Sequence, residues 1–407
     1  MKVLYYHQHF STPSGSTGNR SYAMAKRLLA RGHEVTMICG SYEGGETGLS
    51  GAFHRGRRRG VVDGIEVIEL ELPYSNSHGF VSRSVTFLRF AWRSTIIALR
   101  SDVDLVVATS TPLTAGIPGI VAHWVKRTPF VFEVRDLWPE LPREMGVIRN
   151  PFVLGLMSLL EWVSYRSATR LIGLSPGIVA GIQKRGVSAT RIAMIPNGCD
   201  LEIFSETSTR WRPSEVGSNY LMAVFTGTHG IANGLDSVLD VAAELKRRGR
   251  NDIKLVLIGD GKCKAPLIQR ANDERLDNVV FLPPIPKSKL AGLLAASDLG
   301  LQVLANVQAF YFGTSPNKFF DYLAAGLPVL NNYPGWLADI ILENHCGYVV
   351  PPDDPIAFAD ALTHAAENPL DRKERGRNAR KLGHRLFSRD SLAEKFVDEL
   401  ERSIRLN

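Results

Sequence analysis

The stretch Ser315-Pro-Asn-Lys-Phe-Phe-Asp-Tyr-Leu-Ala-Ala-Gly-Leu-Pro-Val-Leu330 places polar residues just ahead of an apolar helix and strand. We expect Ser315 to cap this helix, so that free backbone N–H groups, Asn317 and Lys318 face one anion. Asp321 follows one turn after Lys318, and its carboxylate can accept two hydroxyl hydrogens of a ribose. The stretch therefore predicts a phosphate site beside a ribose site. An ordinary amphipathic helix with a solvated Lys–Asp pair explains this window equally well.

The composition indicates a folded protein of two domains. A chain of 407 residues can form two separate cores, and 44% hydrophobic with 22% charged residues is typical of globular proteins. The net charge of +7 favours anionic partners such as nucleotide phosphates, a lipid pyrophosphate, an acidic membrane surface or nucleic acid. The 4 cysteines are scattered without a C-x-x-C pair, which predicts reduced thiols rather than disulfides or a metal site.

The sequence predicts a protein that does not cross a membrane. Met1 leads directly into a short apolar strand, so no targeting segment is expected. The longest apolar run, residues 152–160, is interrupted by Glu161 and is too short to span a bilayer. We expect a cytoplasmic protein, with contact at the inner face of the cytoplasmic membrane.

The first half of the chain alternates strands with helices. A strand at 3–6 is followed by a polar loop with Gly15, Gly18 and Asn19, then by a helix at 21–30 and a strand at 34–39. The loop lacks G-x-G-x-x-G and no acidic residue ends the second strand, which argues against NAD. The later strand at 130–134 delivers charged residues to the edge where ligands bind in open α/β sheets, namely Arg135, Asp136 and Glu140.

Two basic segments in this half allow two interpretations each. Residues 42–60 predict a mobile Gly-rich loop whose basic run, 54–59, is solvated or else holds a pyrophosphate or lipid headgroups. Residues 84–99 predict a helix with one apolar stripe and neighbouring arginines. Such a helix faces the protein core, or less commonly lies in a lipid interface. The stripe consists of Val85, Leu88, Trp92, Ile96 and Leu99, beside Arg89, Arg93 and Arg100.

The second half repeats the α/β pattern after a polar segment, 201–217, that we interpret as an interdomain linker. Strands are predicted at 220–225, 254–258, 278–282 and 299–304, each ending in a loop rich in glycine, proline or polar residues. The terminal helix, 389–405, carries Leu392, Phe396 and Leu400 on one face, which predicts a groove for it on a neighbouring element.

Four motifs together resemble the GT-B glycosyltransferases, and within them the retaining family 4: residues 195–200, 227–234, 259–261 and 318–329. Residues 134–140 and 316–322 look closest to the branch with fucosamine-type transferases of O-antigen and capsule assembly. The resemblance implies two Rossmann-like domains facing a cleft. It assigns 1–200 to an acceptor-binding domain, 218–388 to a nucleotide-sugar-binding domain, and 389–407 to a helix that returns to the N-terminal domain.

The resemblance also implies site residues, with three departures from the family pattern. The second and seventh positions of the glycine loop hold Thr228 and Asn233 instead of Arg and Lys, so Lys318 would supply the cation. Gly313 replaces the earlier acid of the family's acidic pair, and Arg135 and Asp136 stand where a His is common. The implied catalytic residues are Lys318, Asp136, Arg135 and Glu140. The implied nucleotide-sugar site consists of Gly15, Gly18, Asn19, Gly227, Thr228, Asn233, Gly234, Gly259, Asp260, Gly261, Pro284, Ser315, Asn317, Lys318 and Asp321.

The function expected from this resemblance is transfer of a sugar, an N-acetylated hexose, from a UDP-sugar to a lipid-linked saccharide in cell-surface glycan synthesis. Retention of configuration is implied by the family. No metal or other cofactor and no nucleic acid is expected, because a helix N-terminus and a lysine can stabilise the departing diphosphate. A UDP-sugar 2-epimerase of the same fold and a nonenzymatic anion binder using residues 54–59 are the alternatives.

Overall fold

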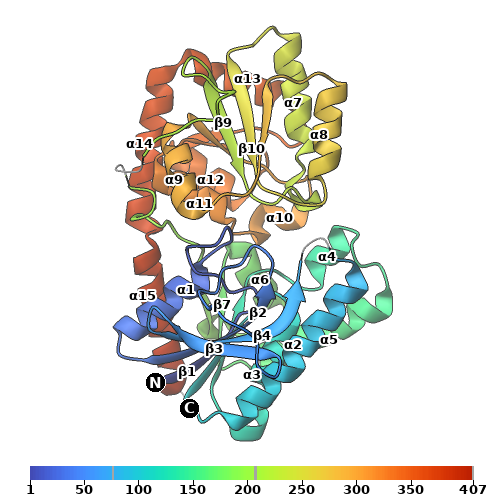
Figure 1. Cartoon of the computed structure of the whole chain (residues 1–407), viewed down its shortest axis with the longest axis vertical. Helices are drawn as coiled ribbons and strands as arrows, with labels where there is room; N and C mark the ends of the chain where they lie inside the picture. The colour runs from blue at the N-terminus through green and yellow to red at the C-terminus, as the bar shows by residue number, and fades with distance from the viewer. Residues whose placement is uncertain (76–77, 206–208, 406–407) are drawn as a thin grey trace. The chain divides into compact units, whose positions relative to one another are not determined.

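The computed structural model describes residues 1–75, 78–205 and 209–405, which divide into two compact units (Figure 1). The first unit comprises Met1–Asn197, Gly313–Ser315 and Asp390–Asn407, and the second comprises Gly198–Phe312 and Pro316–Arg389. Residues 206–208 of the predicted linker and 406–407 of the predicted terminal helix lie outside the described residues. The rest of the linker segment belongs to the second unit, where Trp211 Nε1 donates to Lys289 O at 2.8 Å.

The first unit is built on an eight-stranded sheet in the order β3-β4-β2-β1-β5-β6-β7-β8, in which β3 is antiparallel to β4 and the other pairs are parallel. Its strands are β1 (Lys2–Tyr6), β2 (Glu34–Tyr42), β3 (Arg57–Val62), β4 (Ile65–Tyr74), β5 (Leu105–Thr109), β6 (Phe130–Val134), β7 (Arg170–Gly173) and β8 (Ile192–Met194). Its helices are α1 (Arg20–Ala30), α2 (Phe80–Arg100), η1 (Leu113–Gly116), α3 (Ile117–Lys126), α4 (Glu140–Glu144), α5 (Pro151–Ser167), α6 (Pro176–Lys184), η2 (Ala189–Arg191) and α15 (Arg389–Arg405).

Helices cover both faces of this sheet. Successive side chains of a strand point to opposite faces, and because they are apolar on both, each face must be buried. Leu4 and Tyr6 of β1 join one core with residues of α2, α3, α5 and α6. Val3 and Tyr5 join the other core with residues of α1 and α15. Both faces being apolar explains why these strands read as continuous hydrophobic runs.

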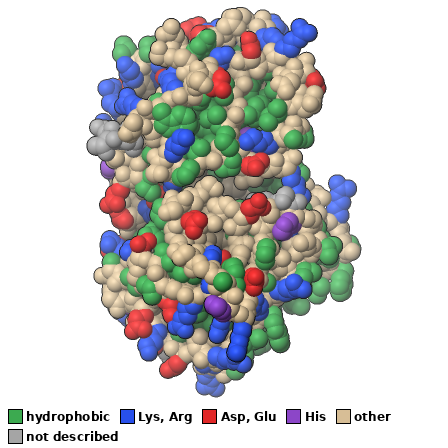
Figure 2. All heavy atoms as spheres, viewed as in Figure 1, with side chains coloured by type: hydrophobic (Ala, Val, Ile, Leu, Met, Phe, Trp, Pro, Cys, Tyr) green, Lys and Arg blue, Asp and Glu red, His purple; other side chains and the backbone are tan. Residues whose placement is uncertain are grey.

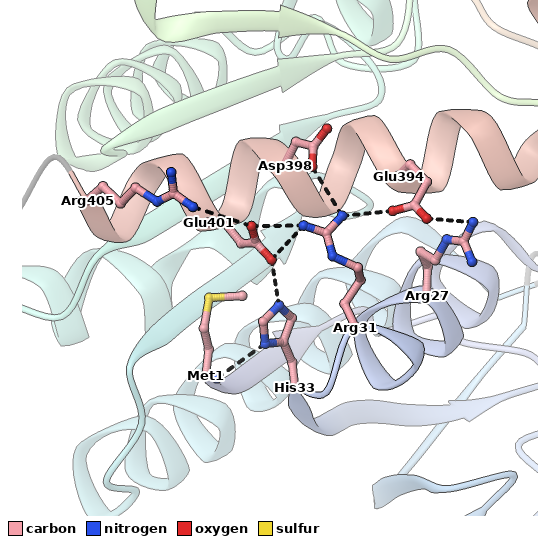
Figure 3. Close-up of polar contacts among 8 residues, drawn as sticks. All are labelled: Met1, Arg27, Arg31, His33, Glu394, Asp398, Glu401 and Arg405. Carbon is pink, nitrogen blue, oxygen red and sulfur yellow. Dashed lines mark hydrogen bonds and ion pairs between the residues drawn. The ribbon is translucent and has the colours of Figure 1, made fainter.

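The helix α15 comes from the far end of the chain and completes the first unit. Phe396 is fully buried and stacks on Tyr5, with ring centroids 6.0 Å apart. At the surface of this contact, Arg31, the residue that follows α1, donates to Glu394, Asp398 and Glu401 at 2.9, 3.2 and 3.0 Å (Figure 3). Apolar packing therefore holds α15 against the sheet, and a row of ion pairs fixes its position along α1.

Two predictions for the first unit are wrong in part. The basic run is not a mobile loop throughout, because residues 57–62 form β3, where Arg58 pairs with Glu69 at 2.8 Å. The apolar stripe predicted to face the core from α2 is largely exposed, and Trp92 is 69% exposed. The side of α2 that packs inward instead carries mostly small residues, Phe90, Ala91, Ser94 and Ala98. These allow the helix to approach the sheet closely.

The second unit is built on a parallel six-stranded sheet in the order β11-β10-β9-β12-β13-β14. Helices α7, α8 and α13 contribute to the core on one face, and α11 contacts α9, α14 and β12. The strands are β9 (Leu221–Thr226), β10 (Ile253–Ile258), β11 (Val279–Leu282), β12 (Leu299–Gln302), β13 (Val329–Asn331) and β14 (Gly347–Val349). The helices are η3 (Ile231–Asn233), α7 (Asp236–Arg247), α8 (Lys264–Asp273), α9 (Lys287–Ala296), α10 (Gln308–Gly313), α11 (Asn317–Ala325), α12 (Trp336–Glu343), α13 (Pro355–Glu367) and α14 (Pro369–Leu386).

Within the described ranges, none of the helices is both long and apolar enough to cross a bilayer. The cysteines Cys39, Cys199, Cys263 and Cys346 are all free, and three of them are buried.

Candidate functional site

Two glycine loops pack against each other at the carboxyl ends of β9 and β10. His229 N donates to Asp260 O at 2.8 Å, and Gly227 N donates to Ile258 O at 3.0 Å. Gly259 has φ +146°, and a Cβ there would lie 1.8 Å from Gly227 O. Only glycine permits this approach, so Gly227 and Gly259 together set the shape of the strand edge. In an open α/β sheet this edge is where ligands bind.

The helix α11 is fixed beside the first of these loops by Tyr322. The Tyr322 hydroxyl accepts from Thr226 N at 3.0 Å and donates to Val224 O at 3.2 Å, both on β9. Its ring lies where Gly300 has no side chain, since a Cβ there would be 2.4 Å from the ring. The start of α11 is thereby held next to the end of β9.

Lys318, on the first turn of α11, projects into the glycine loop. Its Nζ donates to Asn233 Oδ1 at 2.7 Å, lies 3.9 Å from the centre of the Phe225 ring, and would be 3.8 Å from a Cβ at Gly227. Burial lowers the pKa of Lys318 to about 7. Lys318 therefore places a group with a pKa near neutrality against the glycine loop at the strand edge.

The predicted cap of α11 is wrong. Pro316 occupies the N-cap position without a side-chain hydrogen bond, and the helix begins at Asn317. Ser315 instead binds within the first unit, where its Oγ accepts from Asn197 N at 3.0 Å and its carbonyl accepts from Asn197 Nδ2 at 2.6 Å. The first turn of α11 thus lacks a side-chain cap, and the Oδ1 atom of Asn317 is buried without a partner among the described residues.

Asp321 has a different partner from Lys318, although one helical turn separates them. Its carboxylate is buried and lies 3.1 Å from Lys287 Nζ, the first residue of α9. Burial raises the pKa of Asp321, and the nearby Lys287 acts against that rise. Lys287 also forms an ion pair with Asp200, which in turn pairs with Arg389. The four side chains form a buried network of two acids and two bases in the second unit.

Asp200 is the acid of this network that contacts both cations. Burial alone would raise the pKa of Asp200, but Arg389 and Lys287 outweigh it and hold the pKa below the usual value. Arg389 Nη2 also donates to Gly198 O at 2.7 Å. The sequence did not predict this network, since Asp200 lies 87 and 189 residues from its two partners.

The other predicted residues of the second unit lie at the same strand edge. Gly234 has φ +55° and packs on Ala305, while Thr228, Asp260 and Pro284 are exposed. The backbone N–H of Gly261 donates to Asp260 Oδ1 at 2.8 Å. His229, which we did not predict, is fully buried between Phe225 and Phe281. Burial lowers the pKa of His229 to about 4.

In the first unit, Arg135 and His7 meet at the carboxyl ends of β6 and β1. Arg135 Nη1 lies 3.3 Å from His7 Nε2, and Arg135 N donates to Ser110 Oγ at 2.9 Å. His7 Nδ1 is 2.5 Å from Ser21 Oγ on α1. Burial, and then the charge of Arg135, lowers the pKa of His7 well below its usual value. His7 is therefore a neutral hydrogen-bonding group at neutral pH.

Asp136 and Glu140 follow Arg135 but occupy different surroundings. Burial raises the pKa of Asp136, and Arg135 acts in the opposite direction. Glu140 begins α4, and its charge adds slightly to the rise that burial causes in the pKa of Glu161. In the described part of the chain, no ion pair joins Asp136 or Glu140 to an arginine. The structure thus brings Arg135 together with His7 but leaves Glu140 apart from them.

The loop before α1 is shaped by internal packing rather than by open space at its glycines. A Cβ at Gly15 would lie 2.3 Å from Ser11 Oγ and 3.0 Å from Glu46 N, so a side chain at this position would collide with the packing of the loop. Gly18 lies just before Asn19, the N-cap residue of α1, whose buried side chain makes no capping bond. Arg20, which we did not single out, forms a buried ion pair with Glu133 at 2.8 Å.

Arg20 ties three segments of the first unit together. Its Nη1 donates to Pro196 O at 2.6 Å and its Nη2 donates to Ile195 O at 2.9 Å. Among the residues that the structure describes, no three His, Cys, Asp or Glu side chains gather as they would around a metal ion.

Each half of the chain matches a known domain family. Residues 15–198 match the "Glycosyl transferase 4-like domain" and residues 209–382 match "Glycosyl transferases group 1". The D-rhamnosyltransferase WbpZ of Pseudomonas aeruginosa is 26% identical over 60% of this chain and 61% of its own. The O-antigen chain mannosyltransferase C of Escherichia coli is 22% identical over 62% of this chain and 66% of its own. The chain thus spans somewhat less than two thirds of the length of these relatives.

The solved structure of Anabaena Alr3699/HepE in complex with UDP and glucose has the same fold, with a TM-score of 0.69, 17% identity, and coverage of 98% of this chain and 99% of that one. Both domain families are glycosyl transferase families, so neither the epimerase nor the nonenzymatic binder is supported. Each unit thus carries a glycosyl transferase domain, and the chain is a glycosyltransferase with the two-domain α/β fold of the GT-B enzymes.

Proposed function

We propose that this glycosyltransferase takes a sugar from a UDP-sugar, and that Lys318 holds the departing diphosphate. The observation that carries the proposal is the position of Lys318 Nζ, which lies 2.7 Å from Asn233 Oδ1 and next to Gly227 at the start of the 227–234 loop. Backbone N–H groups of that loop and of the first turn of α11 would supply further donors to the phosphates. UDP in HepE, a protein of the same fold, supports uridine as the nucleoside.

The reaction we propose retains configuration at the anomeric carbon. The bond between that carbon and the diphosphate oxygen breaks, and the acceptor hydroxyl forms its new bond on the same face. The hydroxyl proton passes to an oxygen of the departing diphosphate, so no protein base is needed. Negative charge grows on the diphosphate as the bond breaks, and Lys318 would stabilise it most where water is excluded. We propose that this protein cation replaces a divalent metal.

Asp321 and Arg135 have supporting roles in this proposal. The ribose hydroxyls are assigned to Asp321, which Lys287 would hold in one position through the 3.1 Å contact. Arg135, Asp136 and Glu140 of the first unit are assigned to hydroxyl groups of the donor sugar or acceptor.

The acceptor in the proposal is a lipid-linked saccharide at the inner face of the cytoplasmic membrane, used for a cell-surface glycan. The names of the relatives support this class, since one acts on O-antigen chains. An N-acetylated hexose, and more narrowly a fucosamine-type sugar, is the donor sugar that we propose from the motifs at 134–140 and 316–322.

The first experiment compares thermal stabilisation by UDP, GDP and NAD, because a ligand that binds the folded state raises its stability. Stabilisation by UDP alone is expected, and stabilisation by GDP or NAD alone would contradict the donor class. Lys318→Met is expected to abolish most of the UDP effect. Lys254→Met is the matched control, since Lys254 also lies over an aromatic ring, at 5.0 Å from the centre of Tyr220.

A further inference from the structure

The outer side of α2 is apolar and uncovered. Val81 and Trp92 are 73% and 69% exposed, and the residues between them on the same side of the helix are also exposed. Their spacing of three, four or seven residues places them on one side of the helix, in a stripe that runs along most of its length. The stripe consists of Val81, Val85, Leu88, Trp92 and Leu99. A soluble surface rarely exposes so many large apolar side chains in a row.

A second exposed stripe lies on α5, on the same layer of helices. Phe152 is 73% exposed, and Leu156, Leu159 and Trp162 are about half exposed. Helix α3 contacts both α2 and α5, and its Trp124, which is 67% exposed, donates from Nε1 to Ser167 Oγ at the end of α5. Figure 2 shows green and blue side chains at the lower right, where α5 lies in Figure 1. We call the outer sides of α2, α3 and α5 the apolar–basic face.

The charges on this face are of one sign. Helix α2 contains four arginines, and α3 ends in Lys126. The one acidic residue in the sequences of α2, α3 and α5 is Glu161, which is buried and paired with Arg185 at 2.6 Å. Arg166 lies over the Trp162 ring at 5.6 Å. The face therefore presents apolar side chains and cations to whatever covers it.

A lipid surface matches this chemistry better than a second copy of the chain. Two copies joined by this face would bring arginines against arginines, with no exposed carboxylate on α2, α3 or α5 to neutralise them. Anionic phospholipids offer phosphates to the arginines and acyl chains to the apolar stripes. Tryptophans such as Trp92, Trp124 and Trp162 favour the boundary between headgroups and acyl chains.

We infer that the apolar–basic face docks the first unit on a bilayer that contains anionic phospholipids, with Trp92 and Leu88 in the headgroup–acyl boundary and Arg89 and Arg100 at phosphates. This inference rests on the proposed function, because the lipid-linked acceptor proposed there is the reason to choose a membrane as the partner of this face. Docking by this face would hold the acceptor-binding domain at the surface from which a lipid-linked acceptor emerges.

The test is co-sedimentation of the full chain with vesicles of phosphatidylcholine alone or of phosphatidylcholine and phosphatidylglycerol in equal parts. Binding is expected to the anionic vesicles and to fall as salt is raised. The double variant Leu88→Ser/Trp92→Ser should weaken binding at least about tenfold, because each side chain loses apolar burial. Arg89→Gln/Arg100→Gln should lose the preference for anionic vesicles. Leu370→Ser, at an exposed apolar residue of the second unit outside the proposed site, is the control and should bind as the parent does.

Equal binding by the parent and Leu88→Ser/Trp92→Ser would overturn the inference. So would a concentration-dependent dimer of the parent that the same variant abolishes without any vesicle binding, since a second copy would then be the occupant. UDP stabilisation measured without vesicles separates this inference from the proposed function. A variant that keeps the UDP effect is folded, and a parent that binds vesicles but not UDP would refute the proposed function alone.

Discussion

Binding of UDP should take up a proton at Lys318, and its affinity should fall steeply above neutral pH. With a pKa of about 7, the ammonium form of Lys318 drops from about half of the molecules at pH 7 to about 1% at pH 9. If only that form binds the diphosphate, the apparent Kd for UDP rises about 50-fold, which equals about 2.3 kcal/mol. The charge of UDP changes little over this range, because a terminal phosphate with a second pKa of about 6 is already about nine-tenths ionised at pH 7.

Isothermal titration calorimetry at several pH values, in buffers with different ionisation enthalpies, measures both the Kd and the proton uptake. At pH 8 about 0.9 proton should be taken up per UDP bound, because about a tenth of the free protein is already protonated there. Lys318→Arg should bind with little pH dependence, since its pKa stays above about 12, and Lys318→Met should bind weakly at every pH. Lys254→Met should behave as the parent.

A Kd for UDP that stays level from pH 7 to 9 in the parent, without proton uptake, would refute this reasoning. The free protein offers an independent check on the sign. Because folding lowers the pKa of Lys318 from 10.5 to about 7, the unfolded chain binds more protons between these values. The unfolding free energy should therefore rise with pH across this window in the parent, relative to Lys318→Met.

Three further variants test the packing described above. Phe396→Ala should lower the unfolding free energy by about 3–5 kcal/mol in urea denaturation, whereas Leu386→Ala, at a half-exposed site, should cost much less. Asp200→Asn removes the carboxylate partner of Arg389 and one of the two partners of Lys287, and should cost about 3–5 kcal/mol. The exposed Asp360→Asn should cost at most about 1 kcal/mol, and equal losses would contradict the buried network. Burial raises the pKa of Glu161 to about 6 from 4.5, so the folded state binds more protons between these values and stability should fall as pH rises through them. Urea titrations at several pH values should show that fall in the parent and a flatter profile in Glu161→Gln.

The alternation of strands and helices could be predicted from the sequence, because buried parallel strands form short apolar runs between helical patterns. The strand ends that carry Gly227, Gly259 and Arg135 follow from the same pattern. The packing direction of α2 could not be predicted. Its inward side holds Ala91, Ser94 and Ala98, whose small side chains give a weaker hydrophobic signal than the exposed stripe of large ones.

The candidate site was predictable only where its members are close in sequence or carry a glycine signature. The contact of Lys318 with Asn233 joins residues 85 positions apart in the sequence. Helical spacing alone placed Asp321 beside Lys318, but in the structure Asp321 pairs with Lys287. A one-turn spacing fixes which side of a helix two residues share, but the tertiary partners decide where each side chain reaches. Ser315 does not cap α11 for the same reason, since its hydroxyl and carbonyl oxygens accept hydrogen bonds from Asn197 instead.

The return of α15 to the first unit bears on how this chain is synthesised. The segment from Gly198 to Arg389 separates α15 from the rest of the first unit, and ribosomes adding about 5–20 residues per second need roughly 10–40 s to make it. During that interval the groove for Phe396 beside Tyr5 stays open, and the nascent first unit exposes apolar surface. Chaperone engagement of the nascent chain is therefore expected to persist until α15 has left the ribosome and covers the core around Tyr5.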